Sequence, residues 1–295
     1  MNKGDYAMKK IINNTNREYI ITDEFNEMIK SHNNYSNQKK AKPDIGTPLP
    51  NYLWVNIRGG GNTTNLKLLT ENLHEIKIIE FRGKEKYIEF TLEYKSRDSF
   101  DSELRRLDNE IKSSAGYNRY FRGVICININ EWLEHIHEDH FKRFLNYISE
   151  SNHKILVILL IHTYEKNMIE IVESVLSAYM RIETIVFKFP DPNKTVDFLE
   201  KQYMKNSGFI LLDSAKTLLI ETIKELTASK NFNGFKKICQ IAEDILYTII
   251  EKKLCDQKHI SAEMLSDYSK DSSYVKRAKY QINTKKTIGF IERGV

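Results

Sequence analysis

The sequence predicts an α/β fold, in which a parallel sheet covered by helices is followed by a small all-helical domain. Apolar runs of strand length alternate with helix-like segments between residues 51 and 192. Parallel strands that are buried on both faces show this alternation. A glycine-rich turn follows the first apolar run, and beyond residue 193 the apolar spacing becomes continuously helical. These three observations define the expected fold class.

Length, composition and charge limit the class of protein that this sequence can form. The chain has 295 residues, of which 41% are hydrophobic and 29% charged, so it can bury one substantial core and a small second domain. The longest apolar run, residues 155–161, is too short for a membrane span, and we expect no signal peptide. The three cysteines show no C-x-x-C spacing, which favours a reducing, cytoplasmic location. A net charge of +5 permits nucleic-acid contact without requiring it.

The first fifty residues are polar. Residues 22–32 have the spacing of a short helix capped by Thr22 or Asp23, and residues 33–50 predict an exposed connector. The elements then expected in the core are strand 52–57, helix 64–74, β-rich runs 76–83 and 86–94, helix 99–114, strand 122–129, helix 139–151, strand 154–161, helix 166–179 and strand 182–189. Three further helices are expected over residues 195–207, 212–229 and 234–254.

These elements divide the chain into four parts. They are a polar N-terminal segment (1–50), an α/β core (51–192), a helical lid (193–257) and a polar basic tail (258–295). The tail carries Tyr268, Tyr274 and Tyr280 among lysines and arginines. Such a composition fits stacking on single-stranded DNA or RNA, and it fits equally a terminal segment that docks a partner.

The glycine turn is the strongest motif. Strand, glycine loop and helix in this order form phosphate cradles, because glycine lets backbone N–H groups crowd an anion. The pattern G-x-x-x-x-G-K-[ST] describes such a loop. The matching stretch here is Asn56-Ile57-Arg58-Gly59-Gly60-Gly61-Asn62-Thr63. Asn56 replaces the first glycine and Asn62 replaces the lysine, whereas Thr63 or Thr64 retains the hydroxyl.

The order of elements, with this loop after the first strand and helices at the end, resembles the AAA+ ATPase superfamily of P-loop proteins. The resemblance covers roughly residues 52–254. It implies a site for ATP or ADP, with Mg²⁺ as an uncertain companion, between sheet and lid. A plain strand-to-helix turn with Thr64 as N-cap is the alternative, and the sequence leaves it open.

The resemblance also locates an altered acidic pair. In the family an apolar strand ends in Asp-Glu, where Asn128 and Ile129 stand here. Shifting the register by two residues gives Asn130 and Glu131. Because asparagine is a poorer ligand for Mg²⁺ than a carboxylate, Asn128 argues against efficient hydrolysis. Glu131 is the candidate catalytic base, and a glutamate favoured at a helix start is its alternative reading.

Further family positions fall on polar or basic residues. His162 and Thr163 end the next strand, where a γ-phosphate sensor is usual, and Arg181 precedes the last strand as a candidate arginine finger or inter-subunit contact. Lys236 stands where the sensor-2 helix usually carries arginine. The residues expected to hold nucleotide are therefore Arg58, Gly59, Gly60, Gly61, Asn62, Thr63, Thr64, Asn128, His162, Thr163 and Lys236.

Together these departures predict a largely hydrolysis-deficient AAA+-like protein. It would act as a subunit or adaptor of a larger assembly or as a homo-oligomer, and the resemblance implies action on DNA. One alternative is an active ATPase that uses Arg58 or Lys236 for the missing charge and Glu131 as base. Another is a nucleic-acid-binding protein that uses the basic tail.

A histidine cluster lies outside these motifs. If residues 131–141 were helical, His135 and Asp139 would share one face, as would His137 and His140, and a metal could be held there. The spacing matches no established zinc signature, so we expect a solvated helix start and no metal.

Overall fold

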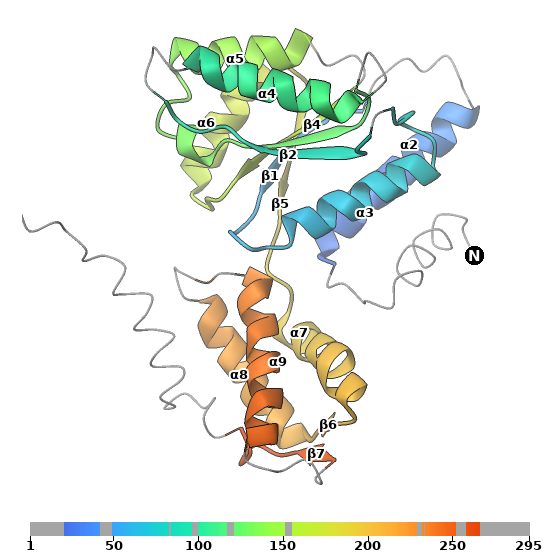
Figure 1. The fold of residues 1–295 in the computed structure, drawn as a ribbon, viewed down its shortest axis with the longest axis vertical. Helices are drawn as coiled ribbons and strands as arrows, with labels where there is room; N and C mark the ends of the chain where they lie inside the picture. The colour runs from blue at the N-terminus through green and yellow to red at the C-terminus, as the bar shows by residue number, and fades with distance from the viewer. Residues whose placement is uncertain are drawn as a thin grey trace, which may run out of the picture. The chain divides into compact units, whose positions relative to one another are not determined.

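The computed structural model describes residues 21–41, 49–82, 84–95, 100–116, 121–150, 155–228, 232, 234–251 and 258–265. The chain divides into two compact units, residues 1–188 and 189–295, each of which has its own core (Figure 1). The sequence had placed this boundary between residues 192 and 193.

A five-stranded parallel sheet forms the centre of the first unit. Its strands are β1 (Asn51–Val55), β2 (Tyr87–Thr91), β3 (Val124–Asn128), β4 (Leu156–Ile161) and β5 (Ile182–Val186). They lie in the order β2-β3-β4-β1-β5, and every neighbouring pair is parallel. The expected α/β class is confirmed, since β1 and β4 are buried along their whole length, as their apolar sequences predicted.

Helices cover both faces of this sheet. On one face lie α2 (Asp23–Ala41) and α3 (Asn62–Glu75); on the other lie α4 (Phe100–Ala115), α5 (Asp139–Glu150) and α6 (Lys166–Ser177) (Figure 1). The step from β1 to β2 runs across the sheet in the opposite direction to the later steps. Because crossover connections are right-handed, α3 must lie on the face opposite α4, α5 and α6.

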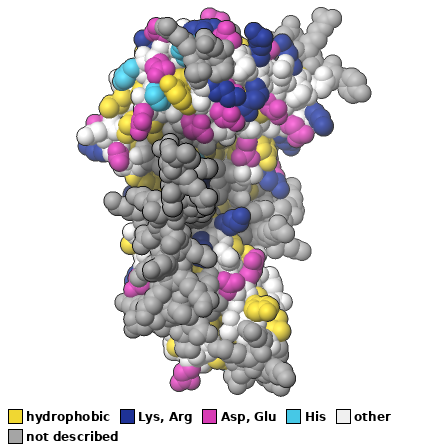
Figure 2. Space-filling model, turned by 60° about the vertical axis from the view of Figure 1, so that its left-hand side comes forward, with side chains coloured by type: hydrophobic (Ala, Val, Ile, Leu, Met, Phe, Trp, Pro, Cys, Tyr) yellow, Lys and Arg dark blue, Asp and Glu magenta, His cyan; other side chains and the backbone are white. Residues whose placement is uncertain are grey.

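Side chains alternate between the two cores along each strand. In β1, Leu53 and Val55 pack with the helices α4 to α6, whereas Tyr52 and Trp54 pack with α2 and α3. Over the visible face of this unit, acidic and basic side chains are interspersed (Figure 2). Among the described residues, no helix is long and apolar enough to cross a membrane.

Two expectations near the start of the chain differ from the structure. The predicted short helix over 22–32 continues to Ala41, so part of the expected connector is helical. The described residues of the β-rich run 76–83, which are 76–82, form no strand, and among them only Arg82 makes a bridge, to Arg122. The chain turns sharply after α3 at Lys77, whose φ of 58° is left-handed, and Ile78 and Ile79 pack at the edge of the core instead.

The second unit is mainly helical. It contains α7 (Pro192–Leu199), the π-helix η4 (Glu200–Met204), the 3-10 helix η5 (Lys205–Ser207), α8 (Asp213–Thr227) and α9 (Gly234–Glu251). The single helix expected over 195–207 is therefore divided into three segments. Two short strands, β6 (Ile210–Leu211) and β7 (His259–Ile260), add a parallel pair that the sequence did not predict.

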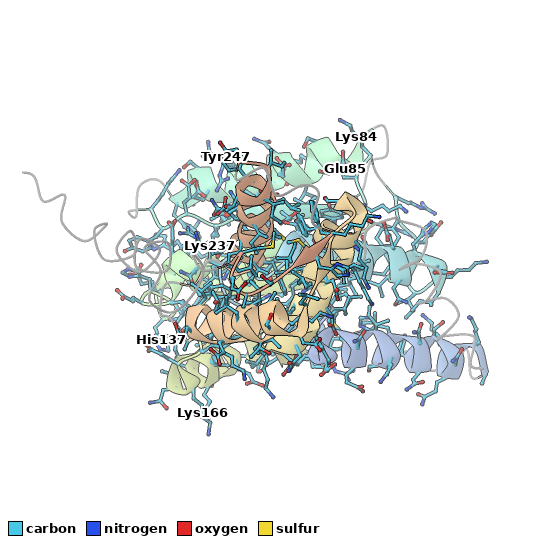
Figure 3. All side chains as sticks on the ribbon, turned by 90° about the horizontal axis from the view of Figure 1, so that it is seen from below. Lys84, Glu85, His137, Lys166, Lys237 and Tyr247 are labelled. Carbon is cyan, nitrogen blue, oxygen red and sulfur yellow. The ribbon has the colours of Figure 1, made fainter. Side chains whose placement is uncertain are left out.

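Helix α9 buries one side and exposes the other. Ile238, Ile241 and Ile245 are fully buried in the core of the second unit, whereas Tyr247 (Figure 3) projects outward and is 67% exposed. The amphipathic spacing seen in the sequence produces this orientation. Residues 266–295 of the predicted basic tail, including its three tyrosines, lie outside the described residues.

Candidate functional site

The glycine loop lies where the sheet changes its winding direction. After β1 the chain leaves for α3 on one face, and after the adjacent β4 it leaves for α6 on the other. In open parallel sheets, ligands bind at the carboxyl ends of the strands next to such a switch point. The residues that follow β1, β3 and β4 therefore define the candidate site.

The loop requires glycine at two kinds of position. Gly59 and Gly61 have φ angles of 77° and 81°, a left-handed conformation that side chains disfavour. At Gly60 a Cβ would lie 2.2 Å from Oδ1 of Asn56, so a side chain there would have to displace that of Asn56. The amide of Gly60 donates to the carbonyl oxygen of Ile57 at 3.0 Å and closes the turn.

Helix α3 begins directly after the loop. Its N-cap is Gly61, which offers no side-chain acceptor, so the alternative that Thr64 caps this helix was wrong. The first intrahelical bond runs from the amide of Asn65 to Gly61 at 2.9 Å. The amides of Asn62, Thr63 and Thr64 therefore precede it without an intrahelical acceptor, and no acid lies in the first turn. This helix start can bind an anion.

The side chain of Asn56 occupies the inside of the loop. It is 4% exposed, and its Nδ2 donates to the carbonyl oxygen of Gly60 at 3.1 Å and to Oδ1 of Asn62 at 2.7 Å. Its Oδ1 accepts a hydrogen bond from the amide of Ile57 at 2.9 Å. The two positions at which the loop departs from the phosphate-loop pattern are thus bonded to each other. Sequence reasoning treated them as separate losses.

A chain of hydrogen bonds joins the ends of β1, β3 and β4. Nδ1 of His162 donates to the carbonyl oxygen of Asn56 at 2.8 Å, and the amide of His162 donates to Oδ1 of Asn130 at 2.9 Å. The amide of Asn130 donates in turn to Oδ1 of Asn128 at 3.0 Å. His162 and Asn128 are therefore linked to the glycine loop through Asn130. The hydroxyl of Thr163 instead accepts from the amide of Glu165, before α6.

Glu131 is attached to a different part of the site. It lies in the 3-10 turn η2 (Asn130–Trp132), where its carboxylate accepts a hydrogen bond from the amide of Tyr94 at 3.0 Å. The indole N–H of the neighbouring Trp132 donates to the carbonyl oxygen of Glu93 at 3.3 Å. Both bonds fasten η2 to the segment after the edge strand β2. Within the described part of the chain, no hydrogen bond joins Glu131 to the glycine loop.

The three predicted cations belong to different elements. Arg58 is exposed at the loop itself, and Lys236 is exposed on α9 in the second unit. Arg181 comes directly before β5, and the register pairs Asn51 with Ile182, so Arg181 lies at the amino edge of the sheet. The glycine loop follows the carboxyl edge. Within one chain, Arg181 therefore lies at the amino ends of the strands, and the glycine loop lies at their carboxyl ends.

Two further residues approach the loop without a signal in the sequence. The hydroxyl of Thr63 donates to Oε2 of Glu89 at 2.9 Å, which brings a carboxylate from β2 to the first turn of α3. The hydroxyl of Tyr164 donates to the carbonyl oxygen of Phe187 at 2.7 Å and lies beside the backbone of Ile57. Burial raises the pKa of Tyr164, so it remains a neutral hydrogen-bonding group. The two contacts join residues that are 26 and 23 positions apart in the sequence.

Cys126 and the histidine cluster contribute no ligand to this site. Cys126 is buried within β3 as expected, and burial raises the pKa of its thiol. The segment before α5 is not an α-helix, so the helical pairing expected for His135 and Asp139 does not form. His135 stacks on Tyr94, and its Nδ1 lies 2.7 Å from the carboxylate of Glu138. Among the described residues, no cluster of three or more His, Cys, Asp or Glu side chains could hold a metal.

Comparison with known proteins gives similarity at the level of solved structures. No protein-family model and no curated protein matches the sequence. The chain is similar to RuvB, the Holliday junction branch migration motor of Thermotoga maritima, with a TM-score of 0.48 and 10% identity over 82% of this chain and 67% of RuvB. A point mutant of RuvB gives a TM-score of 0.49 and 11% identity over 82% of this chain and 68% of the mutant.

Domain III of the Thermotoga maritima replication initiation protein DnaA is also similar. Its TM-score is 0.45, with 11% identity over 85% of this chain and 95% of that domain. Because these TM-scores lie below 0.5, the similarities do not define the family of the chain. The resemblance to the AAA+ superfamily stays a prediction from its motifs and element order.

Proposed function

We propose that the chain binds ATP or ADP at the glycine loop, hydrolyses it slowly or not at all, and acts as an AAA+-like subunit or adaptor. One observation carries this proposal. Helix α3 starts from a glycine N-cap at the switch point of a parallel sheet, with three amides of its first turn lacking an intrahelical acceptor. A phosphate group bound there would accept from these amides and interact favourably with the helix dipole.

Slow hydrolysis follows from what surrounds this anion site. The lysine position is Asn62, whose side chain is held by Asn56, so this position supplies no cation for the transferring phosphoryl group. The aspartate position is Asn128. The carboxylate of Glu131, the candidate base, accepts from the amide of Tyr94. An active ATPase would require Arg58 or Lys236 to replace the lysine and Glu131 to leave that bond.

Assembly with other subunits is supported by the place of Arg181. Because it lies on the opposite edge of the sheet from its own glycine loop, an arginine finger at this position could serve only the nucleotide of a neighbouring subunit. We therefore propose that the protein works as a homo-oligomer or within a larger complex, on DNA as the resemblance implies. A loss of nucleotide-dependent self-association in Arg181→Ala, measured by light scattering, would support this role; unchanged association would contradict it.

The nucleotide proposal is tested by thermal unfolding with ATP and with ADP. Binding should stabilise the protein by about 2.7 kcal/mol at a hundredfold excess over Kd, which shifts the melting temperature by several degrees. Phosphate release should stay at the background rate. Turnover that disappears in Glu131→Gln would overturn the hydrolysis-deficient proposal, and the absence of any nucleotide effect on melting would overturn binding.

Thr64→Asp distinguishes a lost site from a misfolded loop. A carboxylate in the first turn of α3 should raise the stability of the free protein by about 0.3–1 kcal/mol while it repels phosphate. The variant should therefore melt slightly higher alone and lose its response to nucleotide. Asn167→Asp, in the first turn of α6, is the matched control: it should keep the nucleotide response, and its loss there would contradict the assigned site.

A further inference from the structure

We propose that Glu89 supplies the carboxylate for a Mg²⁺ ion that accompanies the nucleotide, in place of the acid that is missing at Asn128. The hydroxyl of Thr63 would be the second protein oxygen. This inference rests on nucleotide binding at the glycine loop and assigns a role to a residue that the sequence motifs did not single out.

The orientation of Glu89 follows from its strand. In β2, Ile88 and Phe90 point into the core with α4 to α6, so Glu89 points to the α3 face. Its Oε2 lies 2.9 Å from the hydroxyl of Thr63 in the first turn of α3. The carboxylate therefore stands beside the amides proposed to bind phosphate.

Asn128 lies on the same face of the sheet. Ile127 belongs to the α4 to α6 core and Cys126 to the α3 core, so the next residue, Asn128, faces α3 again. The register pairs Glu89 with Cys126 and Thr91 with Asn128. Glu89 and Asn128 are thus diagonal neighbours on adjacent strands. A carboxylate on β2 can therefore reach the same space next to α3 that a carboxylate on β3 would reach.

The chemistry of these oxygens fits Mg²⁺ only together with a phosphate. Mg²⁺ keeps several waters and is held by one or two carboxylates plus phosphate oxygens in nucleotide sites. One carboxylate and one hydroxyl make a weak site alone, and the positive end of the α3 dipole opposes a bare cation. Nucleotide and Mg²⁺ should therefore bind with positive coupling. Without Mg²⁺, the carboxylate of Glu89 should repel the phosphates.

A simpler role for Glu89 is to hold the first turn of α3 through Thr63. The two roles predict different results for Glu89→Gln, since the amide keeps a hydrogen-bond acceptor for Thr63 but loses the charge. A holding role predicts the same Mg²⁺ effect on nucleotide affinity in the variant and the unchanged protein. A ligand role predicts that the Mg²⁺ effect is lost and that affinity in EDTA rises.

The experiment measures ADP affinity by calorimetry, in MgCl₂ and in EDTA, for the unchanged protein, Glu89→Gln and Glu183→Gln. Glu183 is an exposed strand glutamate on β5 and serves as the matched control. In the unchanged protein and the control, Mg²⁺ should strengthen ADP binding by a factor within about 5–150, the usual range for coupled sites. In Glu89→Gln this factor should fall to about one, with tighter binding in EDTA than in the unchanged protein.

Each outcome bears on a defined claim. ADP binding that Mg²⁺ strengthens equally in Glu89→Gln and in the unchanged protein would overturn the role of Glu89 and leave nucleotide binding intact. Binding that Mg²⁺ does not affect in the unchanged protein would overturn it too. If ADP fails to bind under either condition, nucleotide binding itself fails and this inference falls with it. MgCl₂ alone should leave the melting temperature unchanged.

Discussion

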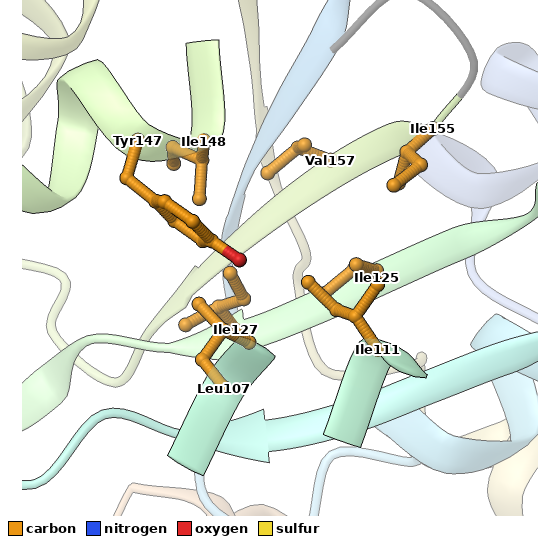
Figure 4. Close-up of a pocket in the computed structure, with 8 residues that line it drawn as sticks. All are labelled: Leu107, Ile111, Ile125, Ile127, Tyr147, Ile148, Ile155 and Val157. Atoms are coloured by element: carbon orange, nitrogen blue, oxygen red, sulfur yellow. The ribbon is translucent and has the colours of Figure 1, made fainter. Parts of the chain in front are cut away.

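The two faces of the central sheet are packed by different chemistry. On the face of α4, α5 and α6, buried aromatic rings contact one another in a row: Phe100 meets Trp132 edge-on, Trp132 stacks on Phe141, and Phe141 lies tilted against Phe144. Apolar side chains also line a small cavity between α4, α5, β3 and β4 (Figure 4).

The face of α2 and α3 buries polar atoms as well. Five side chains on this face have buried nitrogen or oxygen atoms without a partner among the described residues: Asn26, His32, Asn33, Trp54 and Asn72. Thr184 of β5 is the one such side chain described on the opposite face of the sheet. Trp54 is fully buried, and both polar atoms of the Asn72 side chain are affected.

This difference assigns different roles to the two faces. An apolar, ring-packed face resists local opening, whereas buried polar atoms without partners cost free energy and lower local stability. The glycine loop leads into α3, on the less stable face. We therefore interpret the α4 to α6 side as the rigid scaffold and the α2 and α3 side as the part that adjusts when a ligand binds.

The largest expected loss of stability comes from a substitution on the ring-packed face. Phe144→Ala removes a fully buried ring, and the lost transfer energy plus the remaining cavity should cost about 3–5 kcal/mol. Urea unfolding should show the transition at lower denaturant with a similar slope. A cost below about 1 kcal/mol would show that this face is not tightly packed.

The next largest effect is a pH dependence of the folding stability that His32, on the polar face, should cause. This side chain is 1% exposed and contacts the hydroxyl of Tyr52, and burial lowers its pKa from 6.5 to about 4. As pH falls from about 6.5 to about 4, the unfolded chain binds a proton that the folded chain excludes, so stability is lost, on the order of 3 kcal/mol in total.

Variants of two histidines isolate this contribution. In His32→Gln the loss of stability between pH 7 and about pH 4 should be smaller than in the unchanged protein. His137→Gln, at an exposed position, should keep the original pH profile. Identical profiles for the unchanged protein and His32→Gln, measured by urea unfolding at each pH, would contradict the role of His32.

A smaller effect tests the contact between the two replaced loop positions. Because Asn56 bonds to Asn62, we expect Asn56→Gly and Asn62→Lys to be coupled by about 0.5–3 kcal/mol in their effect on ATP affinity. The double variant should bind ATP more tightly than the two single changes predict by addition. Simple additivity in calorimetric titrations would show that the contact has no influence on the loop.

The smallest effect is expected at Asn72. Asn72→Leu replaces two unpartnered polar atoms with an apolar group of similar size, so it should be neutral or stabilising by about 1 kcal/mol. Leu69→Ala, a fully buried position on the same helix, should instead cost about 2–5 kcal/mol. A comparable loss at Asn72 would remove the proposed difference between the two faces.

Much of the fold could be predicted because its signals are local. Residues 155–161 are apolar throughout, and such a run leaves few alternatives to a buried strand. Residues 76–82 carry apolar side chains among charged ones, and Ile76, Ile78, Ile79 and Phe81 pack at the rim of a core without joining a strand of the sheet. Strand propensity reflects how well a side chain fits a partly buried surface, so it does not distinguish a strand from a segment at the rim of a core. The pairing of β6 with β7 depends on residues 49 positions apart and gave no local signal.

The site was less predictable because its contacts cross between strands. The loop and the ends of β3 and β4 were found from motif order. The contacts between Asn56 and Asn62, between His162 and Asn130, and between Thr63 and Glu89 require the register of the sheet. The same register showed that Arg181 and the glycine loop lie at opposite edges.

Residue-resolved hydrogen exchange with and without ADP tests the central claim most directly. The amides of Asn62, Thr63 and Thr64 lack an intrahelical acceptor, so bound phosphate should slow their exchange by about tenfold or more. Amides in α5, on the scaffold side, should change little. Protection confined to the start of α3 and the glycine loop is the predicted result. Unchanged exchange at these three amides under saturating ADP, or protection that appears elsewhere, would contradict a nucleotide site at this loop.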